Sequence, residues 1–184
     1  MVNNTYRLGS VLGTAVAYSV FCELNTYLFS SFSFSTGVDW IFLPSGLRLA
    51  FILIFGIWGA LGIVLASFIG SFNLYFNGDL ITALGAGLIS GFTPLMARRI
   101  SCEWLKLDVH FTTLPTATFI KVVLLFAVLS PVMHQLWYTC RGHTENFMNS
   151  TLVMAAGDLT GTIAVLFAAK SLLSLVPDTW LAGK

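Results

Sequence analysis

The chain of 184 residues is 57% hydrophobic and only 9% charged, whereas soluble domains carry roughly 25% charged residues. Its mean hydropathy of +0.85 and its sixteen phenylalanines exclude a soluble domain, because a domain of this size cannot bury so much apolar surface. The net charge of +1, without a run of basic residues, gives no indication of a nucleic-acid partner. Composition therefore predicts an integral helical membrane protein.

Several apolar stretches approach or exceed the roughly 20 residues that a helix needs to cross a bilayer. We predict six spans, at about residues 8–30, 40–56, 58–76, 79–97, 116–138 and 149–175. The first is predicted to be a retained helix and not a signal peptide, because its apolar part is long and contains Glu23. The second is short, with Pro44 in its first turn, and "GIWG" (56–59) turns it into the third. Pro131 is expected to kink the fifth span or end it early.

The distribution of Lys and Arg orients these spans. With the N-terminus inside, the cytoplasmic segments receive Arg7, Arg98, Arg99, Lys106 and Lys184, and the opposite side receives only Arg141. The tryptophans fall at the span boundaries, as expected for aromatic belts. The predicted fold class is therefore all-α, a polytopic membrane protein with a six-helix transmembrane bundle, one domain over residues 1–184 and both termini cytoplasmic.

Three ionisable residues fall in the outer half of the predicted spans: Glu23, Arg48 and Asp158. An unpaired charge at that depth costs about 3 kcal/mol or more. We predict that Arg48 pairs with Asp158, because guanidinium and carboxylate form bidentate contacts, and that Glu23 is a second partner or a protonated acid. Two interpretations of the pair stay open. It is a structural clamp between the second and sixth spans, or it also lines a cavity for a small anionic or zwitterionic ligand.

Other polar residues in the spans have simpler interpretations. Lys121 and Lys170 are expected to extend toward the headgroups. His134 and His143 are interpreted as solvated or hydrogen-bonded, and no metal site is predicted. The GxxxG from Gly87 to Gly91 is interpreted as a packing seam. No nucleophile–base arrangement, phosphate loop or metalloprotease helix appears in the sequence, so neither an enzyme nor a cofactor is predicted.

Short patterns recur in a fixed order along most of the chain. "WIFLPSGLRLAFILIFG" (40–56) and "WGALGIVLASFIGSF" (58–72) come first, then "ALGAGLISGFTPLMARRI" (83–100), "LDVHFTTLPTATFIKVVLLFAVLSP" (107–131) and "GDLTG" (157–161). This order resembles the membrane-associated sensor (MASE-type) integral membrane domain of bacterial signalling proteins. The positions that carry the pattern are Trp40, Pro44, Gly46, Gly56, Gly59, Gly62, Asp158 and Gly161.

The resemblance implies a multi-pass sensor domain in the bacterial cytoplasmic (inner) membrane. Members of the family typically continue into a histidine kinase, diguanylate cyclase or phosphodiesterase domain. This chain ends at Lys184, a few residues after its last predicted span, so a stand-alone module without an output domain is expected.

Three functions follow as hypotheses. The first is a non-enzymatic sensor-like membrane module that acts through a separate partner protein and binds a small-molecule ligand near Arg48 and Asp158. The second is an accessory or assembly subunit of a larger membrane protein complex. The third is the substrate-binding subunit of a small-solute transporter. A sensor or a transporter needs a polar cavity that reaches the level of Arg48 and Asp158, whereas an accessory subunit does not.

Overall fold

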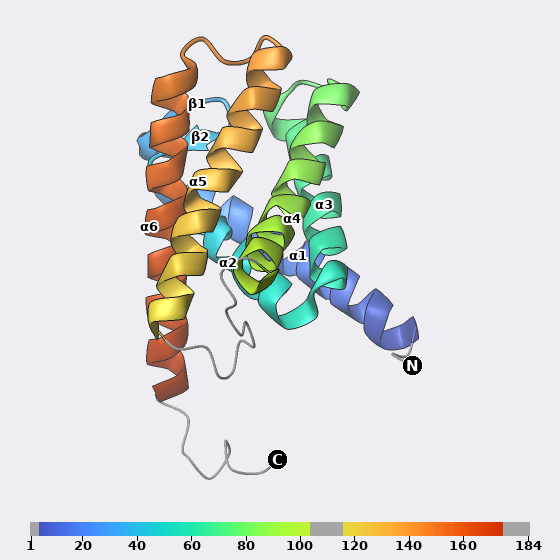
Figure 1. Cartoon of the computed structure of the whole chain (residues 1–184). Helices are drawn as coiled ribbons and strands as arrows, with labels where there is room; N and C mark the ends of the chain where they lie inside the picture. The colour runs from blue at the N-terminus through green and yellow to red at the C-terminus, as the bar shows by residue number, and fades with distance from the viewer. Residues whose placement is uncertain (1–3, 104–115, 175–184) are drawn as a thin grey trace.

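The structure is a computed structural model that describes residues 4–103 and 116–174. The described residues are mostly helical (Figure 1). The helices are α1 (Asn4–Phe29), α2 (Pro44–Phe55), α3 (Ile57–Gly70), α4 (Leu80–Glu103), α5 (Thr116–Cys140) and α6 (Phe147–Ser174). Two short helical turns, η1 (Ser30–Phe32) and the π-helical η2 (Ser71–Tyr75), follow α1 and α3, and two strands, β1 (Ser33–Ser35) and β2 (Val38–Asp39), precede α2.

The described residues are mostly helical, as predicted, but two short strands that the all-α prediction did not include lie between α1 and α2. β1 and β2 form an antiparallel hairpin directly after α1. Gly37, at the turn, has a φ of 71°, which a glycine adopts without steric cost. The segment "SFSFS" before it alternates polar and aromatic residues, a pattern of period two that fits a strand better than a helix. The length of the apolar stretches alone could not reveal so short a hairpin.

Within residues 4–103 and 116–174, three helical stretches are long and apolar enough, by length and composition, to cross a membrane: Ile57–Tyr75, Leu80–Glu103 and Ile120–Cys140. Pro44–Phe55 is a shorter apolar helix. The first of these stretches, Ile57–Tyr75, includes η2, which continues α3 with wider turns. Pro131 lies inside α5 and does not end it, because the helix continues to Cys140.

The helices pack in a chain of neighbours: α1 on α3, α3 on α4, α4 on α5, α5 on α6, and α6 on α2. Figure 1 shows α1 running obliquely across the other helices toward the end of the molecule that holds the hairpin. The GxxxG from Gly87 to Gly91 packs α4 against α3 within the same molecule. A Cβ added to Gly91 would lie 2.6 Å from the carbonyl oxygen of Ala60 on α3. Apolar residues of α2, α4 and α5 form one buried cluster, and residues of α1, α2 and α3 form a second.

α2 begins at Pro44, which lies in its first turn as predicted, so the helix covers only part of the predicted span 40–56. Residues 40–43 are non-helical and run along α6, with the Phe42 N–H donating to the Gly157 carbonyl at 3.2 Å. Asn25 of α1, which is 3% exposed, forms hydrogen bonds with the backbone of the same segment. Its Oδ1 accepts from the Leu43 N–H at 2.9 Å, and its Nδ2 donates to the Ile41 carbonyl at 3.3 Å. Irregular backbone inside a membrane needs such partners, since unsatisfied peptide groups are costly there.

Candidate functional site

Arg48 and Asp158 meet in the interior of the bundle. Nη2 of Arg48 donates to Oδ1 of Asp158 at 2.7 Å, and the two side chains are 1% and 0% exposed. The contact is single and not the bidentate one that the sequence predicts. Nε of Arg48 and Oδ2 of Asp158 are buried without a hydrogen-bond partner. Nη1 has only a long contact of 3.5 Å with the Ser130 hydroxyl. The guanidinium therefore keeps donors that the protein does not use.

The pair sits where three helices converge. Phe42 and Phe126 face the guanidinium, with ring centroids 5.3 and 5.4 Å from its central carbon. Aromatic faces attract a cation and so add to its stabilisation. Ser45, one turn before Arg48 on α2, donates its hydroxyl proton and joins α2 to α6. Its Oγ lies 2.8 Å from the Asp158 carbonyl oxygen and 3.1 Å from Oγ1 of Thr162. These contacts fix both the depth and the rotation of α2 against α6.

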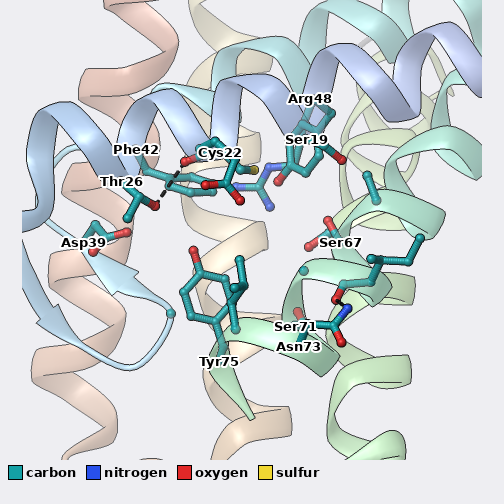
Figure 2. A pocket seen from close by; sticks show the side chains of 18 of the residues that line it. Ser19, Cys22, Thr26, Asp39, Phe42, Arg48, Ser67, Ser71, Asn73 and Tyr75 are labelled. Atoms are coloured by element: carbon teal, nitrogen blue, oxygen red, sulfur yellow. Dashed lines mark hydrogen bonds between the residues drawn. The ribbon is translucent and has the colours of Figure 1, made fainter. Parts of the chain in front are cut away.

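A cavity of about 310 Å³ reaches Arg48 from the side of α1 (Figure 2). Its walls come from α1, the hairpin, the end of α3 with η2, Phe42 and Arg48, two residues of α5 and single residues of α4 and α6. Several hydroxyl and amide side chains line it: Ser19, Thr26, Ser67, Ser71, Asn73 and Ser90. Figure 2 shows Tyr75 pointing into the pocket from the wall opposite α1, with the Arg48 side chain reaching in on the other side. Asp158 lies behind Arg48 and does not line the cavity.

Two carboxylates lie on the walls of this cavity. Glu23 is exposed on α1, and Asp39 belongs to β2. Within residues 4–103 and 116–174, neither has a basic partner, so the structure does not bring Glu23 into the Arg48–Asp158 pair. Burial raises the pKa of Asp39 above its ordinary value, and a hydrogen bond with the Ser33 side chain offsets part of this increase.

His134 is buried in α5, lines the cavity and is hydrogen-bonded on both ring nitrogens. Nδ1 donates to the Ser130 carbonyl at 2.9 Å. In the neutral ring, Nε2 then accepts from the Ser90 hydroxyl, 3.1 Å away on α4. This arrangement follows the prediction of a hydrogen-bonded histidine. It leaves Arg48 as the one cationic side chain among the described residues that line the cavity.

A second ionic cluster lies at the end of the molecule near the hairpin. Asp79 accepts from Nη2 of Arg141 at 3.1 Å, and Nε2 of His143 lies 3.6 Å from its Oδ2. Asp79 also caps α4 through the hydroxyl and the N–H of Thr82. These two hydrogen bonds, followed by those from Arg141, hold the pKa of Asp79 well below its ordinary value. The cluster joins the start of α4 to the α5–α6 loop.

The glycines of the sequence pattern mark close approaches between elements. A Cβ on Gly161 would collide with the Phe42 carbonyl, and one on Gly62 would lie 2.5 Å from the carbonyl oxygen of Val11 on α1. Gly56 ends α2 with a φ of 58°. The remaining positions lie in α2 or next to it. Pro44 and Gly46 are buried in the first turn of α2, and Trp40 is exposed just before that turn. Gly59, in α3, lies against the carbonyl of Phe51 in α2. The pattern therefore specifies how α2 is inserted among α1, α3 and α6.

Several contributors to the site were not predicted from sequence. Asn25, Ser45 and Ser130 are buried polar residues that hold the segment around Arg48. A polar side chain within an apolar span is the only sequence signal that could have identified them. Lys121 is exposed, whereas the side chain of Lys170 lies outside the described residues. In the described part of the chain, no three His, Cys, Asp or Glu residues are grouped so that they could hold a metal ion.

Comparison with protein families gives one match. The MASE1 family model matches residues 12–169, which is most of the chain, and so confirms the resemblance predicted from the order of the sequence patterns. MASE1 is a membrane-associated sensor domain and not a catalytic family. Comparisons with curated proteins and with solved structures found no match.

Proposed function

Because the chain belongs to the MASE1 family, we propose that it is a non-enzymatic, sensor-like membrane module that binds a small ligand near Arg48 and Asp158. The observation that carries this proposal is the cavity that reaches Arg48, because a protein that only scaffolds others has no need of a cavity with hydroxyl and amide groups beside a buried cation. A buried cation with unused donors is expensive in a membrane, and its retention favours a functional role.

In the proposed membrane arrangement, all six helices belong to one multi-pass domain in the bacterial inner membrane. The hairpin and the α5–α6 loop lie outside, and both termini are cytoplasmic. Two features support this orientation. Arg7 lies 5.1 Å from the Trp58 ring and Arg98 lies beside Gly56, so basic residues gather at the α2–α3 turn. Arg141 is at the opposite end, where it pairs with Asp79. Basic residues are enriched on the cytoplasmic side of membrane proteins.

The proposed mechanism uses Arg48 as the movable contact. Its guanidinium connects α2 to Asp158 of α6 and approaches Ser130 of α5. A ligand in the cavity that accepts hydrogen bonds from Arg48 changes the balance of these contacts and so shifts α2 relative to α5 and α6. The ligand must bind the two arrangements with different affinities, since otherwise it shifts no equilibrium. We propose that a separate partner protein detects the shift through the lipid-facing helix surfaces or the cytoplasmic loops.

The test is gentle affinity purification of the tagged protein in mild detergent, with mass spectrometry of everything that co-elutes. We expect a small molecule that is lost from the Arg48→Ala variant, together with a signalling protein. Arg99→Gln is the control, because its partner Glu103 is exposed and lies outside the cavity. Recovery of a stoichiometric membrane complex without any small molecule would contradict the proposal. It would instead favour an accessory subunit in which Arg48 and Asp158 form only a clamp.

A further inference from the structure

The cavity carries charges of opposite sign on different walls. Figure 2 shows the Asp39 carboxyl and the Arg48 guanidinium toward opposite sides of the pocket, with Tyr75 pointing in between. Glu23 lines the same pocket from α1. A ligand in this space therefore meets hydrogen-bond donors from a cation on one side and carboxylate acceptors on the other.

The Arg48 side calls for an acceptor group. Arg48 is 1% exposed, and Asp158 takes only one of its N–H groups. Nε is buried without a partner, although guanidinium N–H groups inside proteins are normally paired. Carboxylate or phosphate oxygens are the acceptors that match its geometry. An anion alone is a poor occupant, however, because Asp158 already neutralises Arg48 and two further carboxylates line the cavity.

The opposite side calls for a cation. Within the described residues, Glu23 and Asp39 have no basic partner, and Asp39 is held in a partly buried position without one. Tyr75 points into the cavity between Asp39 and Arg48, and aromatic faces favour ammonium groups. An ammonium group on this side would supply the missing charge.

We propose that the cavity binds a zwitterion whose anionic oxygen group accepts hydrogen bonds from Arg48 and whose ammonium group lies between Glu23 and Asp39. This inference rests on the proposed function, in which the cavity holds a small ligand. The volume of about 310 Å³ is at the lower end of small-molecule sites, which suits a compact molecule. The same chemistry occurs in a free small zwitterion and in the headgroup of a zwitterionic lipid.

Both sources can reach the cavity. Exposed apolar residues of α3 and η2 line it, for example Ile69, which is 49% exposed, and Leu74, which is 62% exposed. A cavity with such a lining faces the hydrocarbon or the interface of a bilayer, where lipid headgroups and soluble molecules meet. The experiment must therefore separate a lipid from a soluble molecule.

Cys22 provides a reporter inside the cavity. In a Cys102→Ser/Cys140→Ser variant, which removes the two exposed thiols, the rate of maleimide labelling of Cys22 measures occupancy. The protein is placed in nanodiscs of phosphatidylglycerol. The soluble probes are glycerophosphoethanolamine as the zwitterion, glycerol 3-phosphate as the anion and ethanolamine as the cation. A second set of nanodiscs contains phosphatidylethanolamine.

We expect glycerophosphoethanolamine or phosphatidylethanolamine to slow the labelling, at concentrations about tenfold below those needed for either single-charge probe. Protection by the soluble probe identifies a free zwitterion, and protection by the lipid alone identifies a headgroup. Glu23→Gln should weaken protection about tenfold, since it removes a charged contact from an exposed residue without disturbing the core. Glu103→Gln, outside the cavity, should leave protection unchanged.

Two results would contradict the proposal that the cavity binds a zwitterion. If glycerol 3-phosphate or ethanolamine alone protects Cys22 as well as the zwitterion does, the cavity binds a ligand and the proposed function stands, but this ligand class is wrong. If neither the probes nor the lipid slow the labelling, the zwitterion is also wrong. The search for a co-purifying molecule that depends on Arg48 then decides separately whether the proposed function survives.

Discussion

Replacing Asp158 with alanine should leave the buried Arg48 without its carboxylate partner and destabilise the protein strongly. At 2.7 Å and an effective dielectric constant of about 20, two unit charges attract by about 6 kcal/mol. Desolvation of both groups offsets a large part of this attraction, so the pair itself contributes little net stability. Removal of one partner is different, because the remaining charge is buried and uncompensated. We expect Asp158→Ala to lower the free energy of unfolding by about 3–5 kcal/mol.

A double-variant cycle separates the pair from its surroundings. Arg48→Met keeps an unbranched apolar stem between Phe42 and Phe126 while removing the charge. The Arg48→Met/Asp158→Ala protein should be more stable than Asp158→Ala alone, because no charge is then left unpaired. The loss in the double variant should therefore be much smaller than the sum of the two single losses.

The assay is reversible unfolding in mixed detergent micelles, followed by tryptophan fluorescence. Arg99→Gln is the matched control, since it breaks an exposed pair with Glu103 and should change the free energy of unfolding by less than about 1 kcal/mol. The reasoning would be refuted if Asp158→Ala cost no more than this control. It would also be refuted if the two single losses added up in the double variant. Either result would mean that Arg48 is solvated through the cavity and does not depend on Asp158.

Three further predictions concern the fold around the site. Gly161→Ala should destabilise the protein by about 1–3 kcal/mol in the same unfolding assay, because the added Cβ collides with the Phe42 carbonyl; Gly9→Ala, with nothing within 4 Å, should not, and equal effects would contradict the close approach. Asn25→Ala should cost about 1–3 kcal/mol, since it leaves the backbone before α2 without two buried hydrogen bonds, and a neutral effect would show that water replaces them. The lowered pKa of Asp79 means that the ionised form stabilises the fold above about pH 4, the ordinary value, and that this contribution is lost as the pH falls below it. Unfolding as a function of pH should therefore show a loss on acidification that is smaller in Asp79→Asn, and identical pH profiles would refute this assignment.

The sequence predicted the helices well because their signal is local. A helix that crosses a bilayer needs about 20 apolar residues in a row, and this requirement is visible in the sequence alone. The errors lie where the chain is irregular. The second predicted span includes four residues before α2, because residues 40–43 are as apolar as a helix but are held non-helical by Asn25 and the Gly157 carbonyl. The hairpin was missed because it is only a few residues long.

In the site, too, the sequence identified residues, whereas the packing of the helices decided their contacts. Sequence alone selected Arg48 and Asp158, because charges inside apolar spans are rare and need partners. Their single 2.7 Å contact, the unpaired Nε and the separation of Glu23 depend on how far α2 is inserted and how it is rotated. The cavity depends on even more distant parts of the chain, since its walls come from α1, the hairpin, η2 and α5.

The sequence by itself therefore determined the class of protein, the approximate positions of the helices and the identity of the buried pair Arg48 and Asp158. Each of these follows from the free energy of placing a given side chain in an apolar environment, which is a property of single residues and their near neighbours. Only the tertiary structure decided which donors of Arg48 remain free and which carboxylates face them across a cavity. Those features arise from the packing of segments that lie more than 100 residues apart, such as Ser45 against Asp158, and no local pattern encodes that geometry.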